Sequence, residues 1–524
     1  MANELPPPPA FDYRAVSDKI AELLQPIDLK HALLTCRHAQ AFWQGEPCDD
    51  YMRGLLEATE VPVQPIFHGA NLARVIVLHC AEQGGRPMDG DTLVRVVRLI
   101  WETEQHPPAS AELASGEADL LGFIIQLVSA QTERADNKKQ AIGLAAGLFT
   151  DSMPVGPGET LDIPACLDAA LGFPAIEYMR AGLVSMALQA KQTPGGIGMS
   201  GIVREDYVDG HLHMLGENME RYWRTVTQRL ACTPEDFRAK AEAEINELGD
   251  DRYWLYAFNP LKDRPFIQVG DREWIAPVPD YVAARITRSM WHDANAARGK
   301  AFRSAFGFRF QNLVGRIATA SIGRKRVIQE HDLPDKIGQK IGTKSADVIV
   351  TGPGCHALIE CKALQASKRL LSLGRKKDVD YIAERLAGAM EQVCQHAASI
   401  GRGEWAAYGI PAKPCVGIVV SFGQVLGVQG TLLRDRVAKR LAEKKCTPIP
   451  YLLLSVNEFD TLLRLAERRF DLAKVVRTLS EEEDGMFPGR YGRHVATDGI
   501  SSTASIWADP ILDSLLPAAH RGNR

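Results

Sequence analysis

Residues 344–363 read KSADVIVTGPGCHALIECKA, and this stretch decides the fold of the C-terminal part of the chain. Two runs of mostly apolar residues, 345–350 and 356–362, flank the segment TGPGC at 351–355. Because Gly supplies backbone freedom and Pro a fixed φ, this segment favours a tight turn. The pattern predicts a β-hairpin.

The side-chain register of this hairpin predicts a cluster of charged groups. Successive strand residues point to opposite faces, so Leu358, Glu360 and Lys362 share one face. Burying a carboxylate and an ammonium at the end of an apolar strand is costly unless they serve each other or a metal. Asp347 stands between Ala346 and Val348 in the partner strand, and we expect it beside Glu360. Two adjacent carboxylates favour a hard divalent cation.

Asp347, twelve intervening residues and the triplet Glu360-Cys361-Lys362 resemble the core motif of the PD-(D/E)XK nuclease superfamily, which has the restriction-endonuclease-like fold. The resemblance covers roughly residues 300–473. It implies that Asp347, Glu360 and the backbone carbonyl of Cys361 hold Mg²⁺, for which Mn²⁺ can substitute. It also implies that Lys362 orients or activates the attacking water, so the expected catalytic residues are Asp347, Glu360 and Lys362.

Two alternatives compete with this interpretation of the motif. A Glu-x-Lys pair on a hairpin is often only an ion pair on a half-solvated sheet. The preceding Asp, the tight turn and the helices and strands downstream favour the nuclease instead. Pro334-Asp335 also satisfies a loose form of the motif, but it lies among loop-forming residues, so Asp347 is preferred.

Three glutamines are second-tier site residues. Nucleases of this superfamily often carry a Glu on the helix before the first strand. The matching position here is Gln311, which brings no charge. It lies in a helix that begins at residue 300 and that we expect to break at Gly307. Members also place a Gln of the helix after the motif near the metal or phosphate, which points to Gln392 and Gln395. Solvent-facing glutamines are the alternative for both.

A basic run follows the motif. Residues 367–377 read SKRLLSLGRKK and contain no acid. Lysine and arginine supply most of the sequence-independent affinity for nucleic acids, so this run is a candidate contact for the phosphate backbone. A solvated charged segment is the alternative. The candidate nucleic-acid-binding residues are Lys368, Arg369, Arg375, Lys376 and Lys377.

The elements around the motif predict the architecture. A strand near 324–331 precedes the hairpin, and an amphipathic helix at 378–400, a buried strand at 416–422, a helix, a strand at 451–456 and a helix follow. This order predicts a C-terminal restriction-endonuclease-like α/β sandwich with a mixed central sheet. Apolar residues at three- and four-residue spacing over about 12–245 predict a large irregular α-helical domain before it. A GxGxxG sequence at 196–201 follows no strand and is predicted to be a loop.

We therefore expect three parts. They are an α-helical domain of unknown role at 1–245, a nuclease domain at 246–475 that opens with an aromatic-rich connector, and a loosely ordered tail at 476–524.

Ten scattered cysteines without a CxxC pair indicate neither a zinc nor a redox motif. The net charge of −4 gives no overall attraction to nucleic acid, so any contact must be local. The absence of signal-like and membrane-spanning sequences favours a cytoplasmic location and no membrane partner.

The expected function is a Mg²⁺-dependent nuclease that hydrolyses phosphodiester bonds, with DNA as the expected substrate. An endonuclease of restriction, antiviral defence or repair fits this pattern. The alternative is a non-catalytic nucleic-acid-binding or structural protein that retains a nuclease fold, which the uncharged Gln311 favours. The sequence leaves open a homo-oligomer or an activating partner protein.

Overall fold

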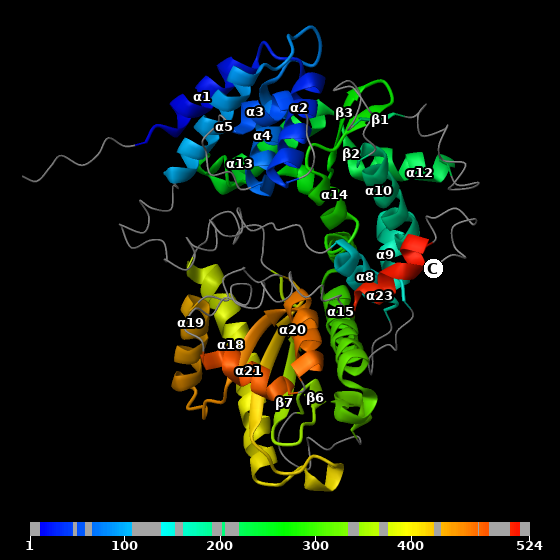
Figure 1. Cartoon of the computed structure of the whole chain (residues 1–524), viewed down its shortest axis with the longest axis vertical. Helices are drawn as coiled ribbons and strands as arrows, with labels where there is room; N and C mark the ends of the chain where they lie inside the picture. The colour runs from blue at the N-terminus through cyan, green and yellow to red at the C-terminus, as the bar shows by residue number, and fades with distance from the viewer. Residues whose placement is uncertain are drawn as a thin grey trace, which may run out of the picture. The chain divides into compact units, whose positions relative to one another are not determined.

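The computed structural model describes residues 11–45, 50–57, 65–106, 138–151, 161–190, 202–204, 219–333, 345–365, 376–423, 431–469, 471–481 and 503–513. The chain divides into two compact units (Figure 1). Unit 1 consists of Met1–Ala118, Ala130–Arg134 and Ala181–Arg285. Unit 2 consists of Asp119–Ser129, Ala135–Arg180 and Ile286–Arg524. Among the described residues, no helix combines the length and apolar character needed to cross a membrane.

Unit 1 is mainly helical, as the periodicity of its sequence predicts. Several helices begin at a side chain that accepts a backbone N–H: Asp12, Asp28, Asp89 and Thr233 take this role. Its helices are α1 (Tyr13–Leu24), α2 (Leu29–Trp43), α3 (Asp50–Glu57), α4 (Pro65–His79), α5 (Gly90–Gln105), α12 (Met219–Thr225), α13 (Pro234–Leu248) and α14 (Pro279–Arg285), and α10 (Ala175–Ala190) begins in unit 2 and ends in unit 1.

Unit 1 also contains a small four-stranded sheet, and two of its strands lie in the region that was predicted to be helical. It has the order β1-β4-β3-β2, with β1 (Ile202–Arg204), β2 (Ala231–Cys232), β3 (Phe266–Gly270) and β4 (Glu273–Ile275). The aromatic segment near 252–285 therefore belongs to unit 1 and does not open the C-terminal unit. Tyr253, Trp254 and Trp274 are buried there, as expected for aromatic core residues.

Unit 2 contains a five-stranded mixed sheet, as predicted. Its order is β5-β6-β7-β8-β9, with β5 (Val327–Gln329), β6 (Val348–Val350), β7 (His356–Lys362), β8 (Cys415–Ser421) and β9 (Tyr451–Ser455). The first three strands pair antiparallel, and β7, β8 and β9 pair parallel. Strand β8 is buried along its whole length, which explains its continuous apolar sequence.

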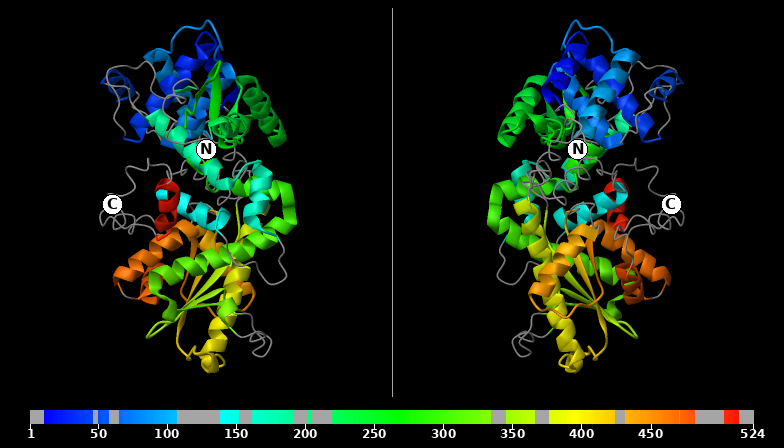
Figure 2. Two further views of the ribbon diagram at one scale, coloured as in Figure 1. Left: turned by 90° about the vertical axis from the view of Figure 1, so that its right-hand side faces the viewer. Right: turned by 90° about the vertical axis from the view of Figure 1, so that its left-hand side faces the viewer.

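Helices cover both faces of this sheet (Figure 2). Helix α18 (Lys376–Gly401) packs on β7 and β8, and its apolar stripe joins Ile349 and Leu358 in one buried cluster. Other helices of the unit are α8 (Lys138–Phe149), α9 (Ile163–Leu171), α15 (Met290–Ile322), α19 (Thr431–Glu443), α20 (Val456–Arg469), α21 (Leu472–Glu481) and α23 (Ser505–Asp513). The predicted alternation of helices and strands is thus present.

The predicted break at Gly307 is wrong, because helix α15 continues through it. The rings of Phe302, Phe306 and Phe310 are buried at successive helical turns, and Phe306 and Phe310 pack edge-on against Phe422. This packing needs a regular helix. The irregularity lies instead at Gly299, whose φ of 53° is accessible to glycine at little cost.

The two compact units do not coincide with the predicted domain boundaries. Helices α8 and α9 contact α15, so part of the N-terminal half belongs to unit 2. Arg309 supports this contact by donating hydrogen bonds to the carbonyl oxygens of Leu148 and Asp151. The expected loose tail contains α21, packed on β8 and β9, and α23, packed on α8. Asp460 holds the start of the α23 segment by accepting the N–H of Thr503 at 3.0 Å.

Candidate active site

The β6–β7 register brings Asp347 next to Glu360. Val348 pairs with Ile359, so Asp347, the residue before β6, comes opposite Glu360. An Asp347 Oδ2 atom accepts the N–H of Cys361 at 2.6 Å. Asp347 is the residue immediately before β6 and not within the strand as predicted. Its carbonyl accepts the N–H of Glu330 at 3.0 Å, next to the last β5–β6 pair. The hairpin nevertheless places the two carboxylates side by side.

Lys362 pairs with one oxygen of Glu360 and leaves the other unsatisfied. Its Nζ donates to Glu360 Oε1 at 2.7 Å. The Glu360 side chain is only 6% exposed. Its Oε2 is buried without any hydrogen-bond partner among the described residues. A buried carboxylate oxygen without a donor is costly, and a bound cation would remove this cost.

The electrostatics of the Asp347 and Glu360 carboxylates also favour a bound cation. Burial, and then the charge of Glu360, raise the pKa of Asp347 to about 8. Burial also raises the pKa of Glu360, although the Lys362 ammonium opposes this shift. A buried carboxylate and a half-buried one side by side cannot both ionise cheaply without a further positive charge. A divalent cation would supply that charge.

The donor set fits a hard cation that retains water. Within the described residues, no group of three or more His, Cys, Asp and Glu side chains is arranged to hold a metal ion. Protein side chains would thus contribute only the carboxylates of Asp347 and Glu360, to which the Cys361 carbonyl adds a backbone oxygen. Mg²⁺ commonly binds through one or two carboxylates and keeps several waters, so the set is compatible with this ion.

A third acid, Glu330, lies close to the pair and was missed in the sequence. Gln311 on α15 donates its Nε2 hydrogen to Glu330 Oε2 at 2.9 Å, and Ser345 Oγ donates to Oε1 at 3.2 Å. The charge of Glu330 contributes to the raised pKa values of both Asp347 and Glu360. The position expected to carry an acid on the helix therefore holds an amide that binds an acid at the end of β5. Only the pairing of β5 with β6 reveals this proximity.

His396 supports the same segment from α18. Its Nδ1 accepts the N–H of Ala346, the neighbour of Asp347, at 2.9 Å. The ring is fully buried, lies 4.3 Å from that of Trp405 between centroids, and has its pKa lowered by burial to about 4. A neutral ring is required, because Nδ1 must accept. The residue was missed because a histidine on a buried helix face resembles an ordinary core residue.

The other predicted site residues do not converge on this centre through any contact that the structure describes. Gln392 is half-buried on α18, and the exposed Gln395 donates to Glu391 at 3.3 Å. Lys376 and Lys377 are exposed in the first turn of α18. Several predictions fall outside the described residues: Lys368, Arg369, Arg375, the Pro334-Asp335 alternative and the glycine-rich loop at 196–201.

Comparison with protein-family models, with curated proteins and with solved structures gave no match. The basis for assigning a function is therefore the geometry and chemistry of the Asp347, Glu360 and Lys362 cluster.

Proposed function

We propose that this protein is a metal-dependent nuclease that hydrolyses phosphodiester bonds in DNA, with Asp347, Glu360 and Lys362 as its catalytic residues. One observation carries the proposal. Two adjacent, mostly buried carboxylates converge at the end of β7, and one of their oxygens, Glu360 Oε2, has no donor among the described residues. Such an arrangement costs stability in the protein alone and becomes favourable when a cation binds.

The arrangement of the sheet supports a restriction-endonuclease-like fold. A helix precedes an antiparallel β5-β6-β7 meander, and α18 then crosses to the parallel strand β8. The resemblance of residues 300–473 to PD-(D/E)XK nucleases implies this order. The resemblance also assigns the acid before β6 and the Glu-x-Lys at the end of β7 to catalysis, and these residues lie together here.

Asp347, Glu360 and the Cys361 carbonyl would hold the cation, Mg²⁺ or Mn²⁺. When bound, the cation would polarise the scissile phosphate and favour ionisation of the attacking water. Lys362 would then be released in part from its contact with Glu360. Its ammonium would orient the water and offset the negative charge that develops on the phosphate.

The neighbouring residues add charge to the centre and hold its side chains and backbone in place. Glu330 adds negative charge beside the pair, and Gln311 and Ser345 hold its two oxygens in place. His396 fixes the backbone next to Asp347. Gln311 had favoured a non-catalytic protein because it brings no charge. Its hydrogen bond to Glu330 weakens this argument, because it brings an acid close to the Asp347 side of the centre.

The test is a cleavage assay on supercoiled plasmid, linear duplex, single-stranded DNA and RNA, with Mg²⁺, with Mn²⁺ and with EDTA. Wild type should cleave DNA only with a divalent cation, and Glu360→Ala and Lys362→Ala should both be inactive. Arg402→Ala and Glu404→Ala are matched controls, since these residues form an exposed ion pair at 2.5 Å after α18. Cation-dependent cleavage that survives in Glu360→Ala would contradict the proposal.

A further inference from the structure

Three exposed residues lie along one side of helix α18 in its first three turns. Lys377, Tyr381 and Arg385 follow one another at four-residue spacing, and all three are exposed. Residues four apart on a helix are neighbours on its surface, so these three form a continuous stripe. We call them the α18 stripe.

Tyr381 is exceptional within this stripe. Its side chain is 62% exposed, and it is the only large hydrophobic residue that is exposed in the described part of the chain. A cation lies one helical turn before it and another lies one turn after it. An aromatic ring between two cations matches a ligand with flat apolar surfaces and regularly spaced negative charges.

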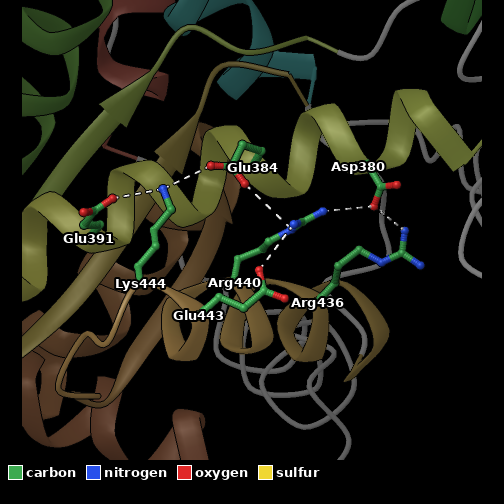
Figure 3. A network of polar contacts seen from close by, with 7 residues as sticks. All are labelled: Asp380, Glu384, Glu391, Arg436, Arg440, Glu443 and Lys444. Atoms are coloured by element: carbon green, nitrogen blue, oxygen red, sulfur yellow. Dashed lines mark hydrogen bonds and ion pairs between the residues drawn. The ribbon is translucent and has the colours of Figure 1, made fainter.

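Three acids of α18, Asp380, Glu384 and Glu391, lie beside the stripe and bind basic residues of the α19 region (Figure 3). Arg436 binds Asp380 at 3.1 Å. Lys444 binds both Glu384 and Glu391 at 3.0 Å. These three acids are therefore paired with cations outside the stripe, and the stripe itself carries the positive charges of Lys377 and Arg385.

The course of the chain relates the stripe to the candidate active site. Strands β7 and β8 are parallel, so α18 begins on the side of the sheet where β7 ends. Glu360 and Lys362 lie at that end of β7. The stripe occupies the first ten residues of α18, so it lies in the part of the helix that is nearest in sequence to the catalytic Lys362.

We propose that the α18 stripe binds single-stranded DNA, with Tyr381 stacked on an unpaired base and Lys377 and Arg385 on the flanking phosphates. Aromatic side chains bind single strands in this way because every base has a flat face, whereas bases within a duplex are already stacked. The inference rests on the proposed nuclease function, and it specifies the substrate as a strand with unpaired bases.

The test is fluorescence anisotropy in EDTA, where no cleavage occurs, with a labelled 20-nucleotide single strand, its duplex and the RNA of the same sequence. Tyr381→Ala should weaken binding of the DNA strand by about 5- to 100-fold and that of the duplex by less than twofold. Tyr381→Trp, which keeps an aromatic ring, should bind the DNA strand as tightly as wild type. Lys377→Ala and Arg385→Ala should each lower the salt dependence of log Kd by about 0.7 for the single strand. Lys439→Ala on α19 is the matched control for loss of an exposed charge.

The outcomes separate this inference from the nuclease proposal. Unchanged single-strand affinity in Tyr381→Ala overturns the stripe even if cleavage is observed. Equal losses for strand and duplex also overturn the stacking role, and tighter binding of the RNA overturns the choice of DNA. A Tyr381-dependent affinity that persists in Glu360→Ala supports the stripe, whatever the cleavage assay shows.

Discussion

Replacing Asp347 by Asn should stabilise the cation-free protein near neutral pH while abolishing cleavage. Asn keeps an oxygen to accept the Cys361 N–H but cannot ionise beside Glu360. The pKa of Asp347 is raised from 3.8 to about 8 in the folded protein. Between these values the native protein keeps a proton that the unfolded chain has released. The stability of wild type therefore falls as pH rises through this window, whereas that of the variant does not.

The size of the effect follows from this shift. Over the interval from pH 5 to pH 7.5, full linkage amounts to about 3 kcal/mol. Asp347 is partly exposed, so solvent screening reduces the expected gain of the variant over this interval to about 2 kcal/mol. Thermal unfolding in EDTA should show the melting temperature of Asp347→Asn rising relative to wild type by roughly 3–6 °C between these pH values. Added Mg²⁺ should narrow the difference by stabilising wild type alone.

Asp332→Asn is the control of opposite sign. Arg324 binds Asp332 at 2.5 Å and lowers its pKa, as does the Gln329 N–H. Asp332 therefore contributes stability that is present above pH 4 and lost as pH falls, and its Asn variant should be less stable than wild type at pH 7.5. A pH-independent difference for Asp347→Asn, or a loss of stability at pH 7.5, would refute the reasoning.

Three further predictions concern the same centre. Lys362→Met should lower the cleavage rate by at least about 100-fold, because the ammonium acts on the reacting phosphate, while DNA affinity in EDTA should change little. A loss of DNA affinity as large as the loss of cleavage rate would make Lys362 a binding residue only. Glu330→Gln should weaken Mn²⁺ binding several-fold in calorimetric titration, since it removes a charge near the carboxylates, and an unchanged affinity would dismiss that role. His396→Leu should reduce cleavage and Mn²⁺ affinity together by freeing the Ala346 N–H, and His396→Asn should recover part of both because its side-chain oxygen can accept; failure of this rescue would indicate a packing role alone.

The sequence predicted those features that depend on local patterns. The β6–β7 hairpin followed from two apolar runs around Gly352 and Pro353, and its register placed Asp347 near Glu360. The long apolar run of β8 and the buried apolar stripe of α18 likewise defined a buried strand and an amphipathic helix. Each of these signals lies within one or two consecutive elements.

What the sequence could not reveal depends on contacts between distant segments. Glu330 becomes a neighbour of Asp347 only through the β5–β6 pairing, and His396 reaches Ala346 across fifty residues. The ordering of Thr503 depends on Asp460, whose role in accepting backbone N–H groups has no local signature. Gly299 and Gly307 offered the same local freedom, and the phenylalanine packing of α15 decided which of them is irregular.

The most direct test of the central claim is a crystal structure of the protein soaked in Mn²⁺, with the anomalous signal of the ion used to locate it. We predict a peak coordinated by the carboxylates of Asp347 and Glu360, with the Glu360 Oε2 atom among its ligands, and the loss of this peak in Glu360→Ala. A saturated crystal with no ion at these two carboxylates, from protein that cleaves DNA with Mn²⁺, would contradict the account.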